Sequence, residues 1–429
     1  MSNKPRMLEG YRVLDFTQFV AGPTCTRVLG EMGAEVIKVE LAPGGDRVRG
    51  GGLKPMSPEF KDSSHSTYYL QHNHSKKSLA LDIRKPGAKE LILKMIPKID
   101  VVVENYAPGV IKKMGFGYEE LRKIKPSIIM CSISALGQTG PLSHKVGYDY
   151  MGQAYSGVTD GLGDADRPPT CVTMAIGDVS TGMSAAMAVG FALIHRERTG
   201  EGQYLDASIL DTYFHMHEAN VPMVSLRGDR FKPTRAGSQH PMGGPTGIFR
   251  YRGDEYVYMA VMPHQWPQLV RAMGMPELAT DPRFRSGRGR RDNNAELQAI
   301  IEKWLGSFPT RDEALAALDK ERVACAPVLT LNQAMAHPHL RERKTVRKVK
   351  DRLLGEVDIP AVPVKFSAWP DKLEVQASLL GEDNDRLLNE VLGMSDAQIK
   401  ELYKEGVLVH DPVIDKGPVP PHATTKKAS

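Results

Sequence analysis

The amino-acid sequence predicts an α/β protein with a Rossmann-like large domain and a smaller α+β domain. Three observations support this prediction. The chain has 429 residues, more than one ordinary hydrophobic core needs. Short apolar runs alternate with helical patterns over the first 140 residues, as in doubly wound parallel sheets. From about residue 222 to 345 turns are more frequent, and two alternating runs predict a β-hairpin.

The first 40 residues have the pattern of one strand–helix–strand unit. The run from Val13 to Phe16 predicts a strand, and Pro23 suits the first turn of the helix that follows. That helix is expected to reach Met32, with Gly33 as its cap. Further strands are expected at residues 36–40, 78–82, 100–104 and 128–133, and an amphipathic helix at 86–96. Helices between consecutive strands imply a parallel sheet covered on both faces.

The rest of the chain indicates the domain boundaries. Residues 179–196 are rich in Gly, Ala, Ser and Met, a composition typical of a buried helix. The expected hairpin covers residues 247–252 and 256–261, followed by helices near 265–273, 294–306 and 311–319. We therefore expect a large domain over residues 1–221 and a small domain over 222–345. A connecting segment with the C-terminal part of the large domain should cover 346–412, and a flexible tail 413–429.

Composition and charge exclude several classes of protein. The net charge of +5 is too small to imply nucleic-acid binding. The longest apolar stretch, residues 183–194, is about 12 residues long and short of the ~20 that a membrane helix needs. The four cysteines lie far apart, so we expect reduced thiols and a cytoplasmic protein. The histidine pairs at 72/74, 215/217 and 337/339 lack a cysteine partner or an HExxH setting, so no metal site is predicted.

Two glycine-containing segments have the chemistry of an active site. Asp178 follows Gly177 immediately before the small-residue helix, where the helix dipole should keep its carboxylate ionised. Such a carboxylate is either a nucleophile or a plain helix cap, and the residues alone leave both readings open. Gly243 and Gly244 fit either an oxyanion-binding lid or a turn that enters the hairpin.

Other candidate sites are weaker. Lys76 and Lys113 fit either phosphate binding or an ordinary solvated surface. The first strand–helix loop has only Gly22-Pro23 in place of a GxGxxG motif, which disfavours a nicotinamide cofactor. Ser180 and Ser184 lack a GxSxG elbow, so a serine hydrolase is not predicted.

Taken together, these residues resemble the class III CoA-transferases, the family of formyl-CoA transferase and carnitine CoA-transferase. The resemblance extends from about Leu8 to about Leu408. It rests on Leu14-Asp15-Phe16-Thr17, Ala21-Gly22-Pro23, the run from Gly33 to Glu40, Asn73-His74-Ser75-Lys76-Lys77-Ser78, Val103-Glu104-Asn105-Tyr106-Ala107-Pro108-Gly109 and Gly137-Gln138-Thr139-Gly140-Pro141. The most specific stretch is Gly177-Asp178 with Gly182 and the run from His195 to Gln203.

The resemblance implies a catalytic role for Asp178 as a covalent nucleophile. It implies CoA transfer from an acyl-CoA to a free carboxylic acid through an aspartyl anhydride and an aspartyl-CoA thioester. Gly243 and Gly244 match the family's glycine loop, which closes over the intermediate. The CoA-binding residues implied by the same matching are Ala21, Lys76, Asn105, Tyr106 and Lys113. Coenzyme A would then be a substrate, with no permanently bound cofactor and no metal.

The resemblance also implies an unusual assembly. Members of the family are dimers in which each chain is an open ring interlocked with a second chain. The N-terminal and C-terminal parts of each chain make the large domain, and the middle part makes the small one. We therefore expect a homodimer, although a heteromer with a related chain stays open.

Some positions depart from the formyl-CoA transferases. Val20 replaces a glutamine, Gly51 replaces a tryptophan and Leu136 replaces a tyrosine. These changes make oxalate a doubtful acceptor and favour a larger or less polar acid, with succinyl-CoA a reasonable donor. The positions expected to contact the acyl group or the acceptor are Val20, Leu136, Gln138 and Tyr148.

Two alternatives of different classes stay open. Acyl-CoA racemases share the fold and use a Gly-His-Asp motif, which here reads Gly147-Tyr148-Asp149. A tyrosine with a pKa near 10 replaces that histidine poorly, so transfer is favoured over epimerisation. A CoA-binding partner subunit without turnover would be expected to have lost the aspartate, and Asp178 is present. Hydrolysis of the acyl-CoA would occur as a leak if water reached the anhydride.

Overall fold

The computed structural model describes residues 5–240, 244–367 and 375–416. The chain divides into two compact units. Unit 1 takes the described residues of Met1–Ser156, Val172–Met216 and Arg341–Ser429, and unit 2 takes those of Gly157–Cys171 and His217–Leu340. The chain therefore leaves unit 1 after Met216 and returns to it at Arg341.

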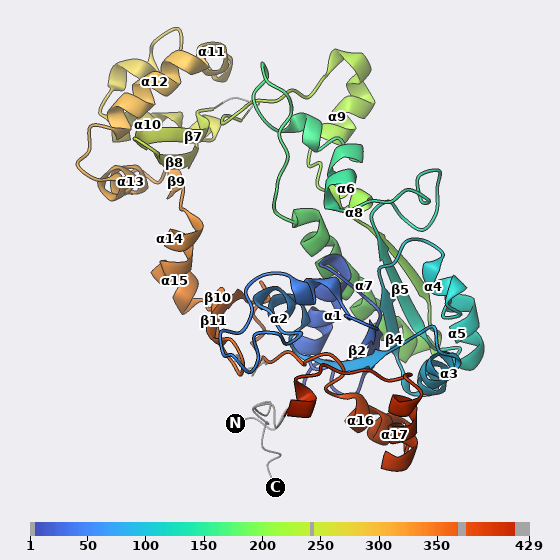
Figure 1. Ribbon diagram of the computed structural model, residues 1–429. Helices are drawn as coiled ribbons and strands as arrows, with labels where there is room; N and C mark the ends of the chain where they lie inside the picture. The colour runs from blue at the N-terminus through green and yellow to red at the C-terminus, as the bar shows by residue number, and fades with distance from the viewer. Residues whose placement is uncertain (1–4, 241–243, 368–374, 417–429) are drawn as a thin grey trace. The chain divides into compact units, whose positions relative to one another are not determined.

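Unit 1 is built on a six-stranded parallel sheet with the order β3-β2-β1-β4-β5-β6 (Figure 1). Its strands are β1 (Arg12–Asp15), β2 (Glu35–Leu41), β3 (Lys76–Leu81), β4 (Val101–Glu104), β5 (Ile129–Ser134) and β6 (Tyr204–Ser208). Its helices up to β6 are α1 (Ala21–Glu31), α2 (Thr67–Asn73), α3 (Pro86–Met95), α4 (Val110–Lys113), α5 (Tyr118–Ile124), α6 (Asp149–Tyr155) and α7 (Ile176–Thr199), and α8 (Ile209–His215) follows β6. This strand order is that of a doubly wound sheet, so the predicted fold class is confirmed for unit 1.

The two faces of the sheet have separate hydrophobic cores because side chains alternate along each strand. On one face Leu14 and Ile37 pack with residues of α3 and of the C-terminal segment. On the other face Val13 and Val36 pack with residues of α1 and α7. Because successive side chains point to opposite faces and both faces are covered, the strands appear in the sequence as short continuous apolar runs.

Helix α7 is the helix of small residues that the sequence predicts, and it packs against α1 and the strands β5 and β6. It is long and apolar enough to cross a membrane by length and composition alone, with a mean hydropathy of 1.3 in its best window. Its residues Ala185, Val189 and Ala192 are buried in the core of unit 1. This packing accounts for the apolar residues on the face of α7 that covers the sheet.

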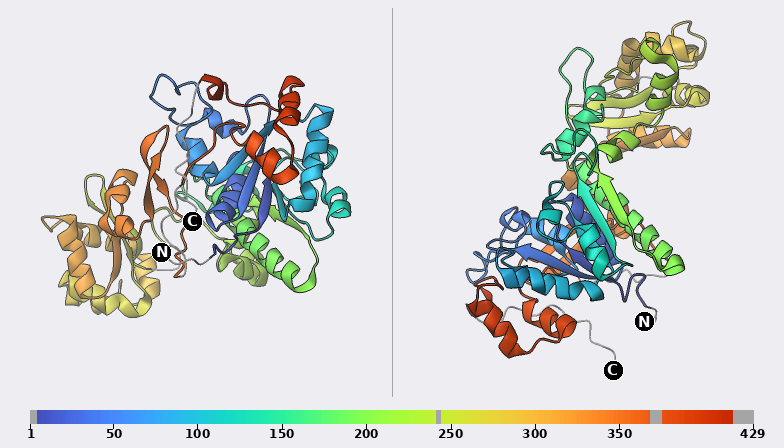
Figure 2. Two further views of the ribbon diagram at one scale, coloured as in Figure 1. Left: turned by 90° about the horizontal axis from the view of Figure 1, so that it is seen from below. Right: turned by 90° about the vertical axis from the view of Figure 1, so that its right-hand side faces the viewer.

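The C-terminal segment packs on the first strands of unit 1, as the red and blue ribbons show in both views of Figure 2. The Asn384 side chain accepts a hydrogen bond from the backbone of Ala80 in β3 at 2.8 Å. The segment contains the antiparallel pair β10 (Val346–Asp351) and β11 (Gly355–Pro360), then α16 (Asn384–Leu387) and α17 (Asp396–Lys404). The sequence did not predict β6. It also did not predict β10 and β11, because only a connecting segment and helices were expected after about residue 345.

The beginning of the predicted tail is also part of the packed structure. Val413 is buried, and its backbone N–H donates to the Asp411 side chain at 2.9 Å. Residues 413–416 are therefore ordered by local contacts, which the polar and proline-rich composition after residue 411 concealed. The remainder of the predicted tail lies outside the described residues.

Unit 2 contains a three-stranded antiparallel sheet with the order β7-β8-β9 and its own core. Its elements are α9 (Asn220–Arg227), β7 (Thr246–Arg252), β8 (Glu255–Ala260), α10 (Trp266–Met273), α11 (Gly287–Asp292), α12 (Asn294–Leu305), α13 (Arg311–Lys320), β9 (Ala324–Pro327) and α14 (Leu331–Ala336), with α15 (Pro338–Glu342) at the return to unit 1. The predicted hairpin is β7–β8, and the three predicted helices are α10, α12 and α13. Residues 157–171 belong to unit 2 because they bond to its loops, for example through Gly237 N–H to the Gly163 carbonyl at 2.9 Å.

Candidate active site

A cavity of about 410 Å³ lies at the carboxyl ends of the central strands of unit 1. It is lined by residues 18–21, 105–108, 133–136, 143 and 145–148, with Arg47, Asp178 and Ile209. The loops at 18–21 and 105–108 follow β1 and β4, the two strands between which the strand order reverses. Crevices at such a switch point are the usual ligand sites of doubly wound sheets.

The two loops are joined by a reciprocal pair of hydrogen bonds. The Asn105 side-chain oxygen accepts from the Gln18 backbone N–H at 2.7 Å, and its amide group donates to the Gln18 carbonyl at 2.7 Å. An amide side chain can accept one hydrogen bond through its oxygen and donate another through its nitrogen at the same time. Asn105 thus fixes the floor of the cavity where β1 and β4 end.

Asp178 lies in the first turn of α7 and faces this cavity. The prediction that Asp178 stands immediately before the helix is wrong, because α7 begins at Ile176. The early helical N–H groups are satisfied from other elements: Asp178 N–H donates to Asp149 Oδ2 at 2.8 Å, and Gly177 N–H donates to the Tyr213 hydroxyl at 3.1 Å. These partners replace the usual N-cap side chain, so the helix extends further toward its N-terminus.

The surroundings of Asp178 raise its pKa to about 7. The largest cause is burial, and the second is the negative charge of Asp149. The expectation that the helix dipole keeps this carboxylate ionised is therefore wrong at neutral pH, because desolvation and a second acid outweigh a dipole worth up to about 2 kcal/mol. At neutral pH both protonation states of Asp178 are populated.

Asp149 is held by a small buried network. Its second carboxylate oxygen accepts from the Tyr213 hydroxyl at 2.7 Å, and Gln153 donates to the same hydroxyl at 3.2 Å. A side chain at Gly177 would overlap the Tyr213 ring, so the close approach of α7 to α8 requires glycine there. The network positions the backbone that carries Asp178.

Seven of the residues predicted from the sequence meet in this one cavity. They are Val20, Ala21, Asn105, Tyr106, Leu136, Tyr148 and Asp178. Burial raises the pKa of Tyr106 to about 12, so its phenol is neutral at physiological pH. They lie after β1, after β4, between β5 and α6, and at the start of α7. They meet because the carboxyl ends of parallel strands lie at the same end of the sheet.

The predicted phosphate-binding lysines do not line the cavity. Lys76 is buried, with its ammonium 3.1 Å from Asp15 and donating to the Asn73 side chain at 2.8 Å and the Pro23 carbonyl at 3.1 Å. Burial lowers the pKa of Lys76 to about 8. Lys113 is exposed at the end of α4.

Two further predicted residues lie elsewhere. Gln138 lies outside the cavity lining, and its backbone N–H donates to the Asp206 carboxylate at 3.0 Å. Gly244 belongs to unit 2, where its carbonyl accepts from Arg290 Nε at 2.9 Å. Gly243 lies outside the described residues.

Sequence reasoning missed some side chains that the structure brings to the site. Arg47, Phe19 and Lys145 line the cavity. The pKa of Tyr68 is raised by burial and by the nearby charges of Asp178 and Asp46, which places its phenol in the field of the candidate nucleophile. No sequence signal marked Arg47, Lys145 or Tyr68, because each lies in a run without periodicity or a motif.

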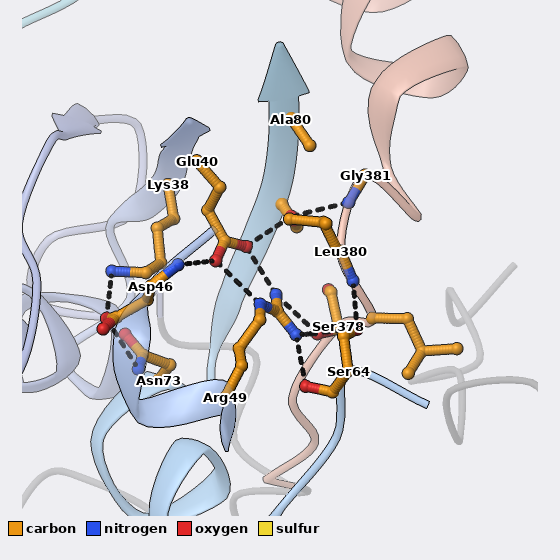
Figure 3. Close-up of polar contacts among 12 residues, drawn as sticks. Lys38, Glu40, Asp46, Arg49, Ser64, Asn73, Ala80, Ser378, Leu380 and Gly381 are labelled. Atoms are coloured by element: carbon orange, nitrogen blue, oxygen red, sulfur yellow. Dashed lines mark hydrogen bonds and ion pairs between the residues drawn. The ribbon is translucent and has the colours of Figure 1, made fainter. Parts of the chain in front are cut away.

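A buried frame of ion pairs supports one side of the site (Figure 3). Lys38 and Asp46 are 3.0 Å apart with side chains inaccessible to solvent, and Arg49 Nε donates to Glu40 at 2.8 Å. Arg49 also donates to the Ser378 carbonyl at 3.2 Å, which joins the C-terminal segment to the frame. Arg49 lowers the pKa of Glu40 to about 2 against the opposing effect of burial, so this acid stays ionised.

In the described ranges no group of three or more His, Cys, Asp or Glu side chains is arranged to hold a metal ion. The four cysteines are free thiols. The chemistry available in the cavity is therefore that of a carboxylate with a pKa near neutrality, amide and hydroxyl groups, and two cationic side chains.

Comparison with known proteins agrees with this site. The family model described as CoA-transferase family III matches residues 8–384. The chain is 33% identical over 405 residues to the succinyl-CoA–D-citramalate CoA-transferase of Chloroflexus aurantiacus, covering 94% of this chain and 98% of that protein. It is also 33% identical over 407 residues to the succinyl-CoA:glutarate CoA-transferase of Mus musculus, covering 95% of this chain and 91% of that protein.

Solved structures show the same relationship. A CAIB/BAIF family protein from Brucella suis superimposes with a TM-score of 0.77 at 32% identity, over 90% of this chain and all of that one. The matched region includes the strands, the cavity loops and Asp178. The chain belongs to CoA-transferase family III and is an acyl-CoA:carboxylate CoA-transferase.

Proposed function

We propose that this enzyme transfers CoA through covalent intermediates on Asp178. The observation that supports the proposal is the position of this carboxylate, which is partly buried, faces the cavity and has a pKa of about 7. A carboxylate of that basicity is a better nucleophile than an ordinary aspartate, and a substantial fraction of it is ionised at neutral pH.

The proposed reaction begins with attack of an Asp178 oxygen on the acyl carbon of the donor thioester. A carbon–oxygen bond forms, the carbon–sulfur bond breaks, and CoA leaves as a thiolate, giving a mixed anhydride. The thiolate then attacks the aspartyl carbonyl, which releases the donor acid and leaves an Asp178–CoA thioester. The acceptor carboxylate attacks that thioester and the two steps run in reverse, so one thioester is exchanged for another and no ATP is consumed.

This chemistry requires that water is excluded from the anhydride and that CoA and the acyl group are held beside Asp178. Val20 and Leu136 are buried apolar side chains in the cavity wall, which keep water away from the anhydride. We assign Ala21, Asn105 and Tyr106 to the thiol end of CoA and Tyr148 to the acyl group. The glycine loop of Gly243 and Gly244 is proposed to cover the intermediate, and Lys113 to contact a phosphate. Lys76 is reassigned from phosphate binding to the frame, because three protein groups already engage its ammonium.

We also propose that the working assembly is an interlocked homodimer. One face of α7 leaves large apolar side chains exposed: Val179, Met187, Phe191 and Ile194. Their spacing along the helix keeps them on one side, and apolar surface of this kind marks a protein interface. A cytoplasmic location remains our prediction from the free thiols.

The test is intact-protein mass spectrometry after mixing with acyl-CoAs, with hydroxylamine or borohydride to trap the intermediate. A mass change confined to Asp178, and absent from Asp178→Ala, is expected. If no acyl-CoA gives an adduct while α-proton exchange occurs in deuterated water, the transfer mechanism is wrong and epimerisation replaces it. If neither occurs with the folded protein and a broad panel of acyl-CoAs, the proposed covalent role of Asp178 is wrong.

A further inference from the structure

Two cationic side chains line the cavity that Asp178 faces. Arg47 has its guanidinium 5.8 Å from the centre of the Phe19 ring, and Lys145 donates to the Tyr155 hydroxyl at 3.0 Å. Within the described part of the chain, neither forms an ion pair with a carboxylate. Asp178 is the one acidic residue among the lining residues, so the cavity wall contains more cationic than acidic side chains.

The backbone that carries Arg47 is held firmly. Arg47 begins a short 3-10 turn, Arg47–Gly50, that Asp46 caps by accepting the Val48 N–H at 3.1 Å. Asp46 is buried against Lys38, and Arg49 is buried against Glu40 (Figure 3). The residues on either side of Arg47 are therefore fixed by buried ion pairs, while Arg47 itself is exposed and directed to the cavity. Such support is what a binding residue needs to keep its orientation.

A guanidinium without an acidic partner binds carboxylates and phosphates through paired N–H donors. The cavity volume of about 410 Å³ is near the small end of ligand pockets, which span roughly 300–1,000 Å³. It therefore suits an acyl group and the thiol end of CoA. The CoA phosphates are separated from the thioester by the length of the pantetheine arm, so a carboxylate on the acyl group is the anion closer to Asp178.

We propose that Arg47 binds the distal carboxylate of a dicarboxylic acyl group or acceptor while Asp178 reacts at its other end. The inference rests on the proposed function of Asp178. It assigns the substrate class, a short dicarboxylic acid, and a residue that selects it. Lys145 is the second cation of the same cavity and serves as the internal comparison.

The test compares succinyl-CoA with butyryl-CoA. The two thioesters have the same CoA and the same number of acyl carbons. The acyl chain ends in a carboxylate in succinyl-CoA and in a methyl group in butyryl-CoA. The wild-type enzyme should prefer succinyl-CoA in kcat/KM for adduct formation. Arg47→Gln should lower the value for succinyl-CoA by about ten- to a hundredfold and change the value for butyryl-CoA by less than about threefold. Arg47→Lys should recover part of the loss, because a single ammonium keeps the charge but not the paired donors.

A matched control removes an arginine elsewhere. Arg288→Gln changes an exposed side chain of α11 in unit 2 and should leave both thioesters unaffected. If Arg47→Gln keeps the circular dichroism spectrum and the thermal midpoint of the wild type, its lower kcat/KM with succinyl-CoA reflects weaker substrate binding and not unfolding. Equal losses for both thioesters would mean that Arg47 binds a CoA phosphate, and the inference would be wrong.

Other outcomes also decide the question. An unchanged preference in Arg47→Gln, or a preference that disappears in Lys145→Gln alone, overturns the assignment to Arg47. A wild-type enzyme that forms the Asp178 adduct from butyryl-CoA as readily as from succinyl-CoA overturns the dicarboxylic class but leaves the proposed function intact. Absence of any Asp178 adduct from a broad panel of thioesters would instead contradict the proposed function.

Discussion

Replacing Asp178 by asparagine should stabilise the folded protein, and the gain should increase as the pH rises from about 4 to 7. In the unfolded chain an aspartate loses its proton near pH 3.9, whereas burial and Asp149 keep the folded group protonated up to about pH 7. A raised folded pKa contributes stability that is complete below the unfolded pKa and is lost as the pH rises through the folded pKa. Asparagine does not titrate, so it escapes this loss.

The size of the effect follows from the pKa of Asp178. The interval between 3.8 and about 7 corresponds to roughly three pH units, and each is worth about 1.4 kcal/mol. The upper limit of the pH-dependent difference is therefore about 4 kcal/mol. Because the side chain is only partly buried, water screens part of the cost, and a difference of about 2 kcal/mol between pH 4 and pH 7.5 is expected.

The assay is urea unfolding of both proteins at about pH 4.5, 5.5, 6.5 and 7.5, with the free energy taken from the midpoint and slope at each pH. Asp229→Asn is the matched control, because Asp229 is an exposed acid of unit 2. This substitution makes the same carboxylate-to-amide change at an exposed position, so it controls for the change of side chain. A difference between Asp178→Asn and wild type that does not vary with pH would contradict the expected result, since it would show that the carboxylate of Asp178 titrates as an ordinary aspartate.

Three further substitutions test other parts of the structure. Asp149→Asn removes the negative charge beside Asp178, so the midpoint of the pH profile of adduct formation should fall by about one pH unit, and an unchanged midpoint would assign the raised pKa to burial alone. Gly182→Val puts a side chain against the backbone of α1 and should cost about 2–3 kcal/mol, read as a lower urea midpoint at an unchanged slope. Glu40→Gln leaves Arg49 without its buried partner and should cost about 3–5 kcal/mol at pH 7. Since the folded pKa of Glu40 is about 2, its stabilisation is present above about pH 4.5 and is lost as the pH falls toward 2, so acidification from pH 4.5 to 3 should destabilise wild type more than Glu40→Gln.

Much of unit 1 could be predicted because its signals are local. The short apolar runs of β1, β2 and β4 and the 3.6-residue period of α3 are properties of short windows, and the structure has these elements within one or two residues of the predicted bounds. Capping is equally local, and Ser395 forms a capping box with Gln398 three residues later at the start of α17. The strands β10 and β11 were missed because charged residues interrupt them, and their pairing with each other is not encoded in either run alone.

The candidate site was predicted in part. The motifs identified Asp178 and Asn105, but their chemistry depends on partners distant in the sequence. Asp149 precedes Asp178 by 29 positions and determines both its helix start and part of its pKa. Lys76 shows the same limitation, because a lysine pattern cannot reveal that Asp15 lies 3.1 Å away in a buried frame. Burial and charge at a site are tertiary properties, so local reasoning fails first where function is concentrated.

The cost of burying Asp178 has a consequence for the proposed reaction. Formation of the anhydride, or of the thioester, converts the charged carboxylate into a neutral carbonyl group, and the negative charge leaves with the thiolate or the released acid. The burial and the repulsion from Asp149 that raise the pKa of Asp178 therefore destabilise the free carboxylate but not the covalent intermediates. The pKa difference of roughly three units corresponds to at most about 4 kcal/mol, and this free energy would favour acylation of Asp178 relative to an ordinary aspartate. The buried frame on one side of the cavity and the packing of α7 against α1 on the other hold this carboxylate in place despite its cost. Asp149 consequently has two effects in the proposed mechanism, since it anchors the first turn of α7 and makes the nucleophile more basic.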